Sequence, residues 1–208
     1  QMCIRDRYRF TDYRDLVNCD IVDAVDICTS NDAHFKVAMA AVEAGKPFNL
    51  EKPITLTAEE ADILAKAAQE KNVKNMVCFS YRFKAAARYA KDLIAQGKIG
   101  RVYHVNMQYF QAWGLPRANC PLVWRYVKSR TGTGALGDLG SHALDLVRFV
   151  TNKEYTRVVG HTGTYVHERP LLDGEGVGKV DVDDFSNYMA DMEDEISVSF
   201  QITRFAYG

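Results

Sequence analysis

The feature that most constrains the fold is an alternation of short apolar runs and helical segments between residues 22 and 80. Runs rich in β-branched or apolar residues predict strands, and the segments between them have the composition and end signals of helices. The predicted strands cover 22–28, 47–51 and 73–80, and the predicted helices cover 33–45 and 57–72. Because the connections are short, the strands should be parallel and joined by right-handed crossovers. The pattern therefore predicts an α/β fold with a doubly wound parallel sheet.

The ends of these elements carry clear signals. Gly45 is placed to stop the first helix, and Thr57 with Glu60 forms a capping box at the head of the second. The strands end in "CTSN", "LEKP" and "FSYRF", which are more polar than an interior strand requires. Ligands of such sheets bind beyond the carboxyl ends of the strands, so this edge is the predicted ligand side.

Residues 81–208 follow a different pattern and predict a second domain after a first domain at 1–80. Segment 101–110 alternates apolar and polar residues, as in a sheet with one packed face. A long aromatic-rich stretch at 111–135 precedes a predicted helix at about 136–150. Later runs predict further strands, with the last two forming a hairpin. We expect an α+β domain with an open, mostly antiparallel sheet.

Composition excludes several classes of function. The chain has 208 residues and a net charge of -1, so no strong field attracts nucleic acid or an anionic membrane. No apolar run approaches the ~20 residues of a membrane span. The five cysteines are scattered without zinc-site spacing, which favours reduced thiols and a cytoplasmic protein. The start "QMCIRDR" lacks the apolar core of a signal peptide and is given no structural weight.

An acid and an imidazole stand four residues apart in "GDLGSHALDL", as Asp138 and His142. A helix places residues at this spacing on one face. An imidazole can take the proton of an alcohol, and a neighbouring carboxylate can fix its tautomer. Alone, this spacing is more often an exposed helix pair or a capping Asp. The flanking glycines, which permit close backbone approach, favour a catalytic pair only together with the family resemblance described next. Asp145 is expected to be a structural helix residue, although it could also support the pair indirectly.

The motifs "EKP", "FSYRF", "GRVYHV", "WR" and "GALGDLGSHALDLVRF", in this order and at these intervals, resemble the glucose–fructose oxidoreductase, inositol dehydrogenase and MocA family. The resemblance runs from about Tyr8 to the end. Cys78 and Ser80 depart from the Gly and Asn that the family often has there. The resemblance implies a Rossmann domain followed by a substrate domain. It also implies hydride transfer between NAD or NADP and a sugar, inositol or related polyol.

The same resemblance implies roles for single residues. The implied catalytic residues are Lys52, Asp138 and His142. The implied cofactor-binding residues are Thr29, Ser30, Asn31, His34, Glu51, Lys52 and Arg82, although His34 could equally be an ordinary first-turn helix residue. The implied substrate-binding residues are Lys52, Trp124, Arg125, Asp138 and His142. No metal is expected, and the implied partner besides substrate is a second copy of the chain, in a dimer or tetramer formed through the C-terminal sheet.

Residues 1–80 contain no G-x-G-x-x-G pattern, which normally opens a dinucleotide-binding sheet. The resemblance therefore implies that the first strand, the glycine-rich turn and the C-terminal end of the second domain lie outside this chain. Three alternatives to a dehydrogenase remain open at this stage. They are a glycosidase that uses NAD for transient oxidation, a metal-dependent hydrolase built on Asp138, His142 and His104, and a chain that is inactive by itself.

Overall fold

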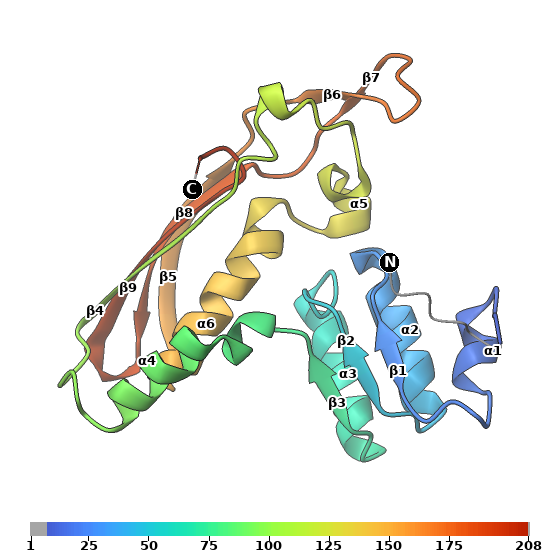
Figure 1. The fold of residues 1–208 in the computed structure, drawn as a ribbon, viewed down its shortest axis with the longest axis horizontal. Helices are drawn as coiled ribbons and strands as arrows, with labels where there is room; N and C mark the ends of the chain where they lie inside the picture. The colour runs from blue at the N-terminus through green and yellow to red at the C-terminus, as the bar shows by residue number, and fades with distance from the viewer. Residues whose placement is uncertain (1–7, 208) are drawn as a thin grey trace. The chain divides into compact units, whose positions relative to one another are not determined.

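The computed structural model describes residues 8–207, and the chain folds as two compact units, residues 1–78 and 79–208 (Figure 1). The expectation about the first seven residues lies outside the described part. None of the helices within residues 8–207 has the length and hydropathy needed to span a membrane.

The first unit is a three-stranded parallel sheet with helical crossovers. Its elements are α1 (Tyr13–Val17), β1 (Val25–Ile27), α2 (Asn31–Glu43), β2 (Phe48–Leu50), α3 (Ala58–Glu70) and β3 (Asn75–Val77). The strand order is β1-β2-β3, and both strand pairs are parallel. As expected from the capping box, the Thr57 side chain accepts a hydrogen bond from the Glu60 amide. This unit confirms the predicted α/β class.

The core of the first unit lies between the sheet and the two crossover helices. Both crossovers step in the same direction, so α2 and α3 pack beside each other on one face of the sheet. Ile27, Leu50 and Val42 are almost completely buried between these layers. The strands are thereby fixed, and their carboxyl ends lie side by side at one edge.

The second unit combines a four-stranded sheet with helices and a long loop region. Its helices and turns are a 3₁₀ turn (Ser80–Phe83), α4 (Ala85–Ala95), 3₁₀ turns at Pro116–Ala118, Trp124–Tyr126 and Glu193–Glu195, α5 (Lys128–Thr131), a π-helical segment (Leu136–Gly140) and α6 (Ser141–Thr151). Its strands are β4 (His104–Phe110), β5 (Tyr155–Gly163), β6 (Glu168–Pro170), β7 (Val177–Lys179), β8 (Phe185–Met192) and β9 (Ile196–Thr203).

The sheet order is β4-β9-β8-β5, and α6 packs on one face (Figure 1). The β8–β9 hairpin and the β5–β8 pair are antiparallel, as expected for a mostly antiparallel sheet. One detail differs, because β4 runs parallel to β9. Alternation along β4 correctly gives the packed and open faces, but it carries no information on the direction of the partner strand. The sheet is therefore mixed.

The predicted helix at 136–150 begins with a different geometry. Leu136–Gly140 forms a π-helical turn, and the regular helix α6 starts only at Ser141. The premise that Asp138 and His142 lie on one continuous α-helix was therefore wrong. A π turn widens the helix locally and changes the direction in which Asp138 leaves the backbone.

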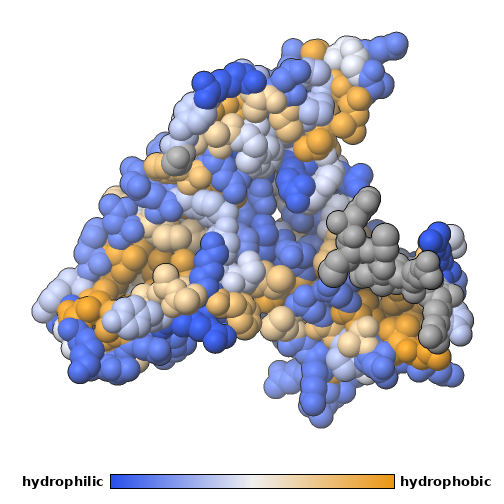
Figure 2. All heavy atoms as spheres, in the orientation of Figure 1, coloured by the Kyte–Doolittle hydropathy of each residue, from blue (hydrophilic) through white to orange (hydrophobic). Residues whose placement is uncertain are grey.

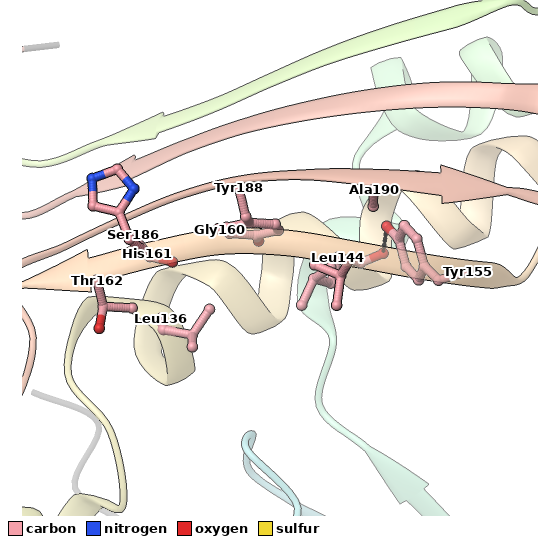
Figure 3. A pocket seen from close by; sticks show the side chains of 10 residues that line it. Leu136, Leu144, Tyr155, Gly160, His161, Thr162, Ser186, Tyr188 and Ala190 are labelled. Carbon is pink, nitrogen blue, oxygen red and sulfur yellow. Dashed lines mark hydrogen bonds between the residues drawn. The ribbon is translucent and has the colours of Figure 1, made fainter.

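This unit has two further apolar features. A cavity of about 530 Å³ opens between α6 and the β5–β8 face, with Leu136, Leu144 and Tyr188 in its lining (Figure 3). The β6–β7 hairpin exposes Leu172 and Val177 and shows hydrophobic colour at the top of the surface view (Figure 2). Neither feature includes a residue that the sequence analysis assigned to catalysis or binding.

Candidate active site

The carboxyl ends of the three parallel strands bring polar side chains to one edge of the first unit. Cys28 follows β1, Glu51 and Lys52 follow β2, and Cys78 follows β3. The Lys52 amide donates to the Glu51 carboxylate at 3.1 Å. Burial raises the pKa of the Cys78 thiol, and the Glu51 carboxylate adds to that effect. Cys78 is thus held as a neutral thiol, which makes it a poor nucleophile.

His34 joins two of the loops at this edge. Its side chain is 0% exposed, and Nδ1 donates to the Pro53 carbonyl at 2.7 Å. Nε2 lies 3.2 Å from the Thr29 carbonyl. Because both nitrogens face main-chain oxygens, the imidazole ties the loop after β1 to the Lys52–Pro53 turn. This placement favours a supporting role for His34, and direct contact with a cofactor stays a prediction.

The start of α2 lies at the same edge. Ser30 occupies the N-cap position, and its hydroxyl donates to the Asp32 carboxylate at 2.5 Å. Asn31 is buried, whereas Thr29 is exposed directly after β1. Thr29 and Ser30 therefore place hydroxyl groups beside the helix N-terminus, which favours electronegative ligand atoms. Their roles in cofactor binding stay predictions.

In the second unit, His142 lies within an aromatic cluster. The Tyr81 ring stacks on the imidazole with centroids 4.5 Å apart and planes 27° apart. Phe79 meets it edge-on at 6.1 Å, and Tyr109 is tilted at 6.5 Å. The hydroxyls of Tyr81 and Tyr109 share a hydrogen bond. The rings restrict the orientation of the half-buried imidazole.

Asp138 is joined to the long loop by a buried arginine. Arg204 is 0% exposed and donates to the Asp138 carboxylate at 3.3 Å. Its guanidinium also donates to the Arg125 carbonyl at 3.4 Å and lies 4.7 Å from the centroid of the Trp113 ring. The cation stabilises the carboxylate form of Asp138 and fixes the loop beside it.

The two predicted substrate-gripping residues are neighbours on this loop. The Arg125 guanidinium lies 4.3 Å from the centroid of the Trp124 ring. Arg125 is exposed and Trp124 is half-buried, so both offer surface to solvent. The stacked pair has the polar and flat faces that sugars contact, and its role stays a prediction.

The π turn is anchored by Asp183, which lies 47 residues after Leu136 in the chain. Its carboxylate accepts from the amides of Gly134 at 2.6 Å and Leu136 at 2.7 Å, and its carbonyl accepts from Ala135 at 2.9 Å. A Cβ atom on Gly134 would lie 1.8 Å from the Asp183 carbonyl oxygen, so only glycine fits. The Gly134 carbonyl in turn accepts from the Asp138 amide at 3.1 Å. The chain thereby fixes the backbone that carries Asp138.

Arg82 and Asp145 form a bidentate pair. Arg82 Nε donates to one carboxylate oxygen at 2.7 Å, and its Nη2 donates to the other. Asp145 is 6% exposed, so this pair satisfies a buried charge and links the 3₁₀ turn before α4 to α6. Asp145 has the structural role expected for it. Nothing in this geometry tests whether Arg82 also contacts a cofactor, so that role stays a prediction.

The described residues 8–207 contain no group of three metal-binding side chains close enough to hold an ion. His104, the proposed third ligand of a hydrolase site, lies at the exposed start of β4.

The sequence matches two family models along nearly its whole length. Residues 5–79 match "Oxidoreductase family, NAD-binding Rossmann fold", and residues 87–208 match "GFO/IDH/MocA C-terminal domain". The chain belongs to the Gfo/Idh/MocA family of oxidoreductases. This confirms the resemblance that the sequence motifs indicated.

Relatives within the Gfo/Idh/MocA family cover the chain well. Levoglucosan dehydrogenase of Pseudarthrobacter phenanthrenivorans is 36% identical over 95% of this chain and 51% of its own length. Inositol 2-dehydrogenase of Salmonella agona is 30% identical over 72% of this chain and 41% of its own length. The chain thus spans about half the length of the curated relatives it matches.

Solved structures agree with the fold. An oxidoreductase domain protein from Kribbella flavida superposes with a TM-score of 0.90 and 42% identity, covering 95% of this chain and 52% of that one. Levoglucosan dehydrogenase in complex with NADH and levoglucosan superposes with a TM-score of 0.89 and 38% identity. The match covers 96% of this chain and 52% of that one.

The strand-end residues of this Gfo/Idh/MocA chain fit one half of a nicotinamide dinucleotide. Thr29, Glu51 and Lys52 place a hydroxyl, a carboxylate and an ammonium group along one sheet edge, next to a helix N-terminus. Such groups suit the hydroxyls of a ribose and the amide of a nicotinamide. Pyrophosphate binding relies on a glycine-rich turn, and residues 1–80 contain none.

Several residues around the candidate catalytic pair were not predicted to act there. Tyr81 and Tyr109 lay in segments already recognised, but a sequence cannot show that a strand residue meets a turn residue 28 positions away. Arg204, which follows the last strand of the hairpin, carried no local signal for its buried position. Asp183 gave no signal, because its partners lie up to 49 positions earlier in the chain.

Proposed function

We propose that the whole protein is an NAD(P)-dependent dehydrogenase that oxidises a secondary hydroxyl of a sugar, anhydrosugar, inositol or related polyol. The observation that carries the proposal is the His142 and Asp138 arrangement within a matched Gfo/Idh/MocA domain. Relatives named levoglucosan dehydrogenase, 1,5-anhydro-D-fructose reductase and inositol 2-dehydrogenase support the substrate class.

In this proposal, the cofactor and three side chains of the chain have separate roles. A bound nicotinamide supplies the hydride acceptor. An imidazole nitrogen of His142 accepts the hydroxyl proton as the carbon loses hydride, and an imidazole near neutrality suits this step. Asp138, kept ionised by Arg204, stabilises the imidazolium that results. The Lys52 ammonium stabilises developing alkoxide charge.

The choice between NAD and NADP is left to the experiment. The relatives include a scyllo-inositol 2-dehydrogenase from Bacillus subtilis whose name specifies NADP(+), 34% identical over 63% of this chain. One of the similar solved structures is levoglucosan dehydrogenase in complex with NADH.

The test is formation of reduced cofactor by the purified whole protein with a panel of sugars, anhydrosugars and inositols. We expect absorbance of NADH or NADPH to rise with at least one compound. A glycosidase would instead release free sugar from a glycoside without net reduction of cofactor. Absence of both reactions across the panel would contradict the proposal.

We further propose that two copies associate through the open face of the β4-β9-β8-β5 sheet. The central row of that face runs Asn106, Ser199, Met189, Val159 and carries no charge. Met189 is 60% exposed and Val159 is 64% exposed. Sedimentation of the whole protein should show an oligomer, and Met189→Lys should shift it toward monomer. The four cysteines within residues 8–207 are free, which supports a cytoplasmic location that cell fractionation would measure.

A further inference from the structure

Tyr81 lies face to face with the imidazole of His142. It belongs to a 3₁₀ turn, Ser80–Phe83, that contains no buried residue. The Tyr81 side chain is half-buried, and the Lys84 ammonium lies 4.2 Å from the centroid of its ring. The outer end of the ring is tied to β4 by a hydrogen bond that its hydroxyl shares with that of Tyr109.

Tyr109 is held much more firmly than Tyr81. It lies in β4, which pairs with β9 along its whole length. Its hydroxyl accepts from Gln111 Nε2 at 3.2 Å, and the Gln111 side-chain oxygen accepts from the Trp113 indole N–H. Burial, followed by the hydrogen bond to Tyr81, raises the pKa of Tyr109 above its usual value. The Tyr109 hydroxyl therefore keeps its proton at neutral pH and remains able to donate.

We propose that Tyr109 is a positioning residue for His142. Its hydroxyl holds the Tyr81 ring flat against the imidazole and so keeps the proton acceptor in one orientation. This rests on the proposed function of His142 as the base, and it adds two residues that act through geometry rather than through proton transfer. A base must lie within hydrogen-bond reach of the proton it takes, so loss of one orientation slows the step.

The test compares Tyr109→Phe, Tyr81→Phe and the double variant in the whole protein, with saturating cofactor and the best alcohol of the panel. Each change deletes one oxygen atom and keeps the ring. We expect each single variant to lower kcat roughly tenfold, with KM for the alcohol changed less than about threefold. Because both variants remove the same hydrogen bond, the double variant should lose no more than the worse single variant.

Tyr188→Phe is the matched control. Tyr188 is also buried in this unit, and within residues 8–207 its hydroxyl has no hydrogen-bond partner. The control should keep kcat within about twofold of the unaltered protein. Positioning by Tyr109 is overturned if either single variant keeps full kcat, if the two losses multiply, or if the loss appears in KM alone. A loss in KM alone would mean that these hydroxyls bind substrate.

His142→Ala separates this inference from the proposed function. If His142→Ala loses turnover while both tyrosine variants keep it, positioning fails and the base assignment stands. If His142→Ala keeps turnover, the base assignment fails and the inference fails with it. If Tyr109→Phe does not fold, Tyr81→Phe still removes the same hydrogen bond from its other side and decides the question.

Discussion

Lys52 is the residue whose assigned role is easiest to separate from a contribution to the fold. It is half-buried at the carboxyl end of β2, where His34 and the strand hold the backbone of the turn. Lys52→Ala should therefore fold normally and lose most turnover, because a developing alkoxide then has no cation beside it. Circular dichroism and kcat measure the two effects. Loss of the native fold, or full turnover, would contradict the assignment.

For the Arg82–Asp145 pair we expect an effect on stability, in contrast to Lys52, because the pair links two segments of the second unit. Arg82→Met leaves a buried carboxylate without its bidentate partner, so the free energy of unfolding should fall by roughly 2 kcal/mol. This is below the value for a fully buried pair because Arg82 is partly exposed. Denaturant titration measures the change.

Arg148→Met is the control for that variant. Arg148 pairs with Glu154, and both side chains are exposed. Its removal should leave the midpoint of unfolding nearly unchanged. Equal losses for the two variants would show that burial of Asp145 does not decide the energetics.

At the scale of elements, the π turn and the start of α6 depend on Asp183. Its carboxylate satisfies two amides that the helix start leaves without partners. Asp183→Ala should lower the free energy of unfolding by about 2 kcal/mol, near one for each amide. Asp181→Ala, which removes a single exposed bond to the Lys128 amide, should cost less than half as much. If denaturant titration gave the two variants the same free energy of unfolding, the Asp183 carboxylate would not be what anchors the π turn.

The elements also show what the sequence could predict. Period-two alternation gave the packed face of β4, and the capping box gave the start of α3, because both signals are local. The π turn was missed because its geometry depends on Asp183, 47 residues after Leu136. The parallel direction of β4 was missed for the same reason. Its partner β9 lies about 90 residues later, and alternation is the same for both directions.

At the scale of the whole molecule, the catalytic motif was found and its surroundings were not. Asp138 and His142 were recognised from their spacing, the flanking glycines and the family resemblance, although the helix between them is not the regular one assumed. Tyr81, Tyr109 and Arg204 surround that pair through contacts between distant segments. Such contacts depend on tertiary packing, which no spacing within one segment encodes.

The 208-residue chain by itself should bind a dinucleotide only weakly. Residues 1–80 hold groups suited to the ribose and nicotinamide but no glycine-rich turn for the pyrophosphate. The chain by itself should therefore bind NAD or NADP no tighter than about millimolar, worth only ~4 kcal/mol. Titration calorimetry measures this affinity. Micromolar binding would mean that the pyrophosphate is held by residues other than those considered.

We propose that His142 takes the proton of the alcohol, and kcat for cofactor reduction by the whole protein carrying His142→Ala measures this role. His167→Ala, which changes an exposed histidine of the same unit, is the control. The account predicts a loss of roughly 10² to 10⁴ in kcat for His142→Ala, the usual contribution of general base catalysis, and none for the control. A His142→Ala protein that turns over within a few fold of the unaltered enzyme would contradict it.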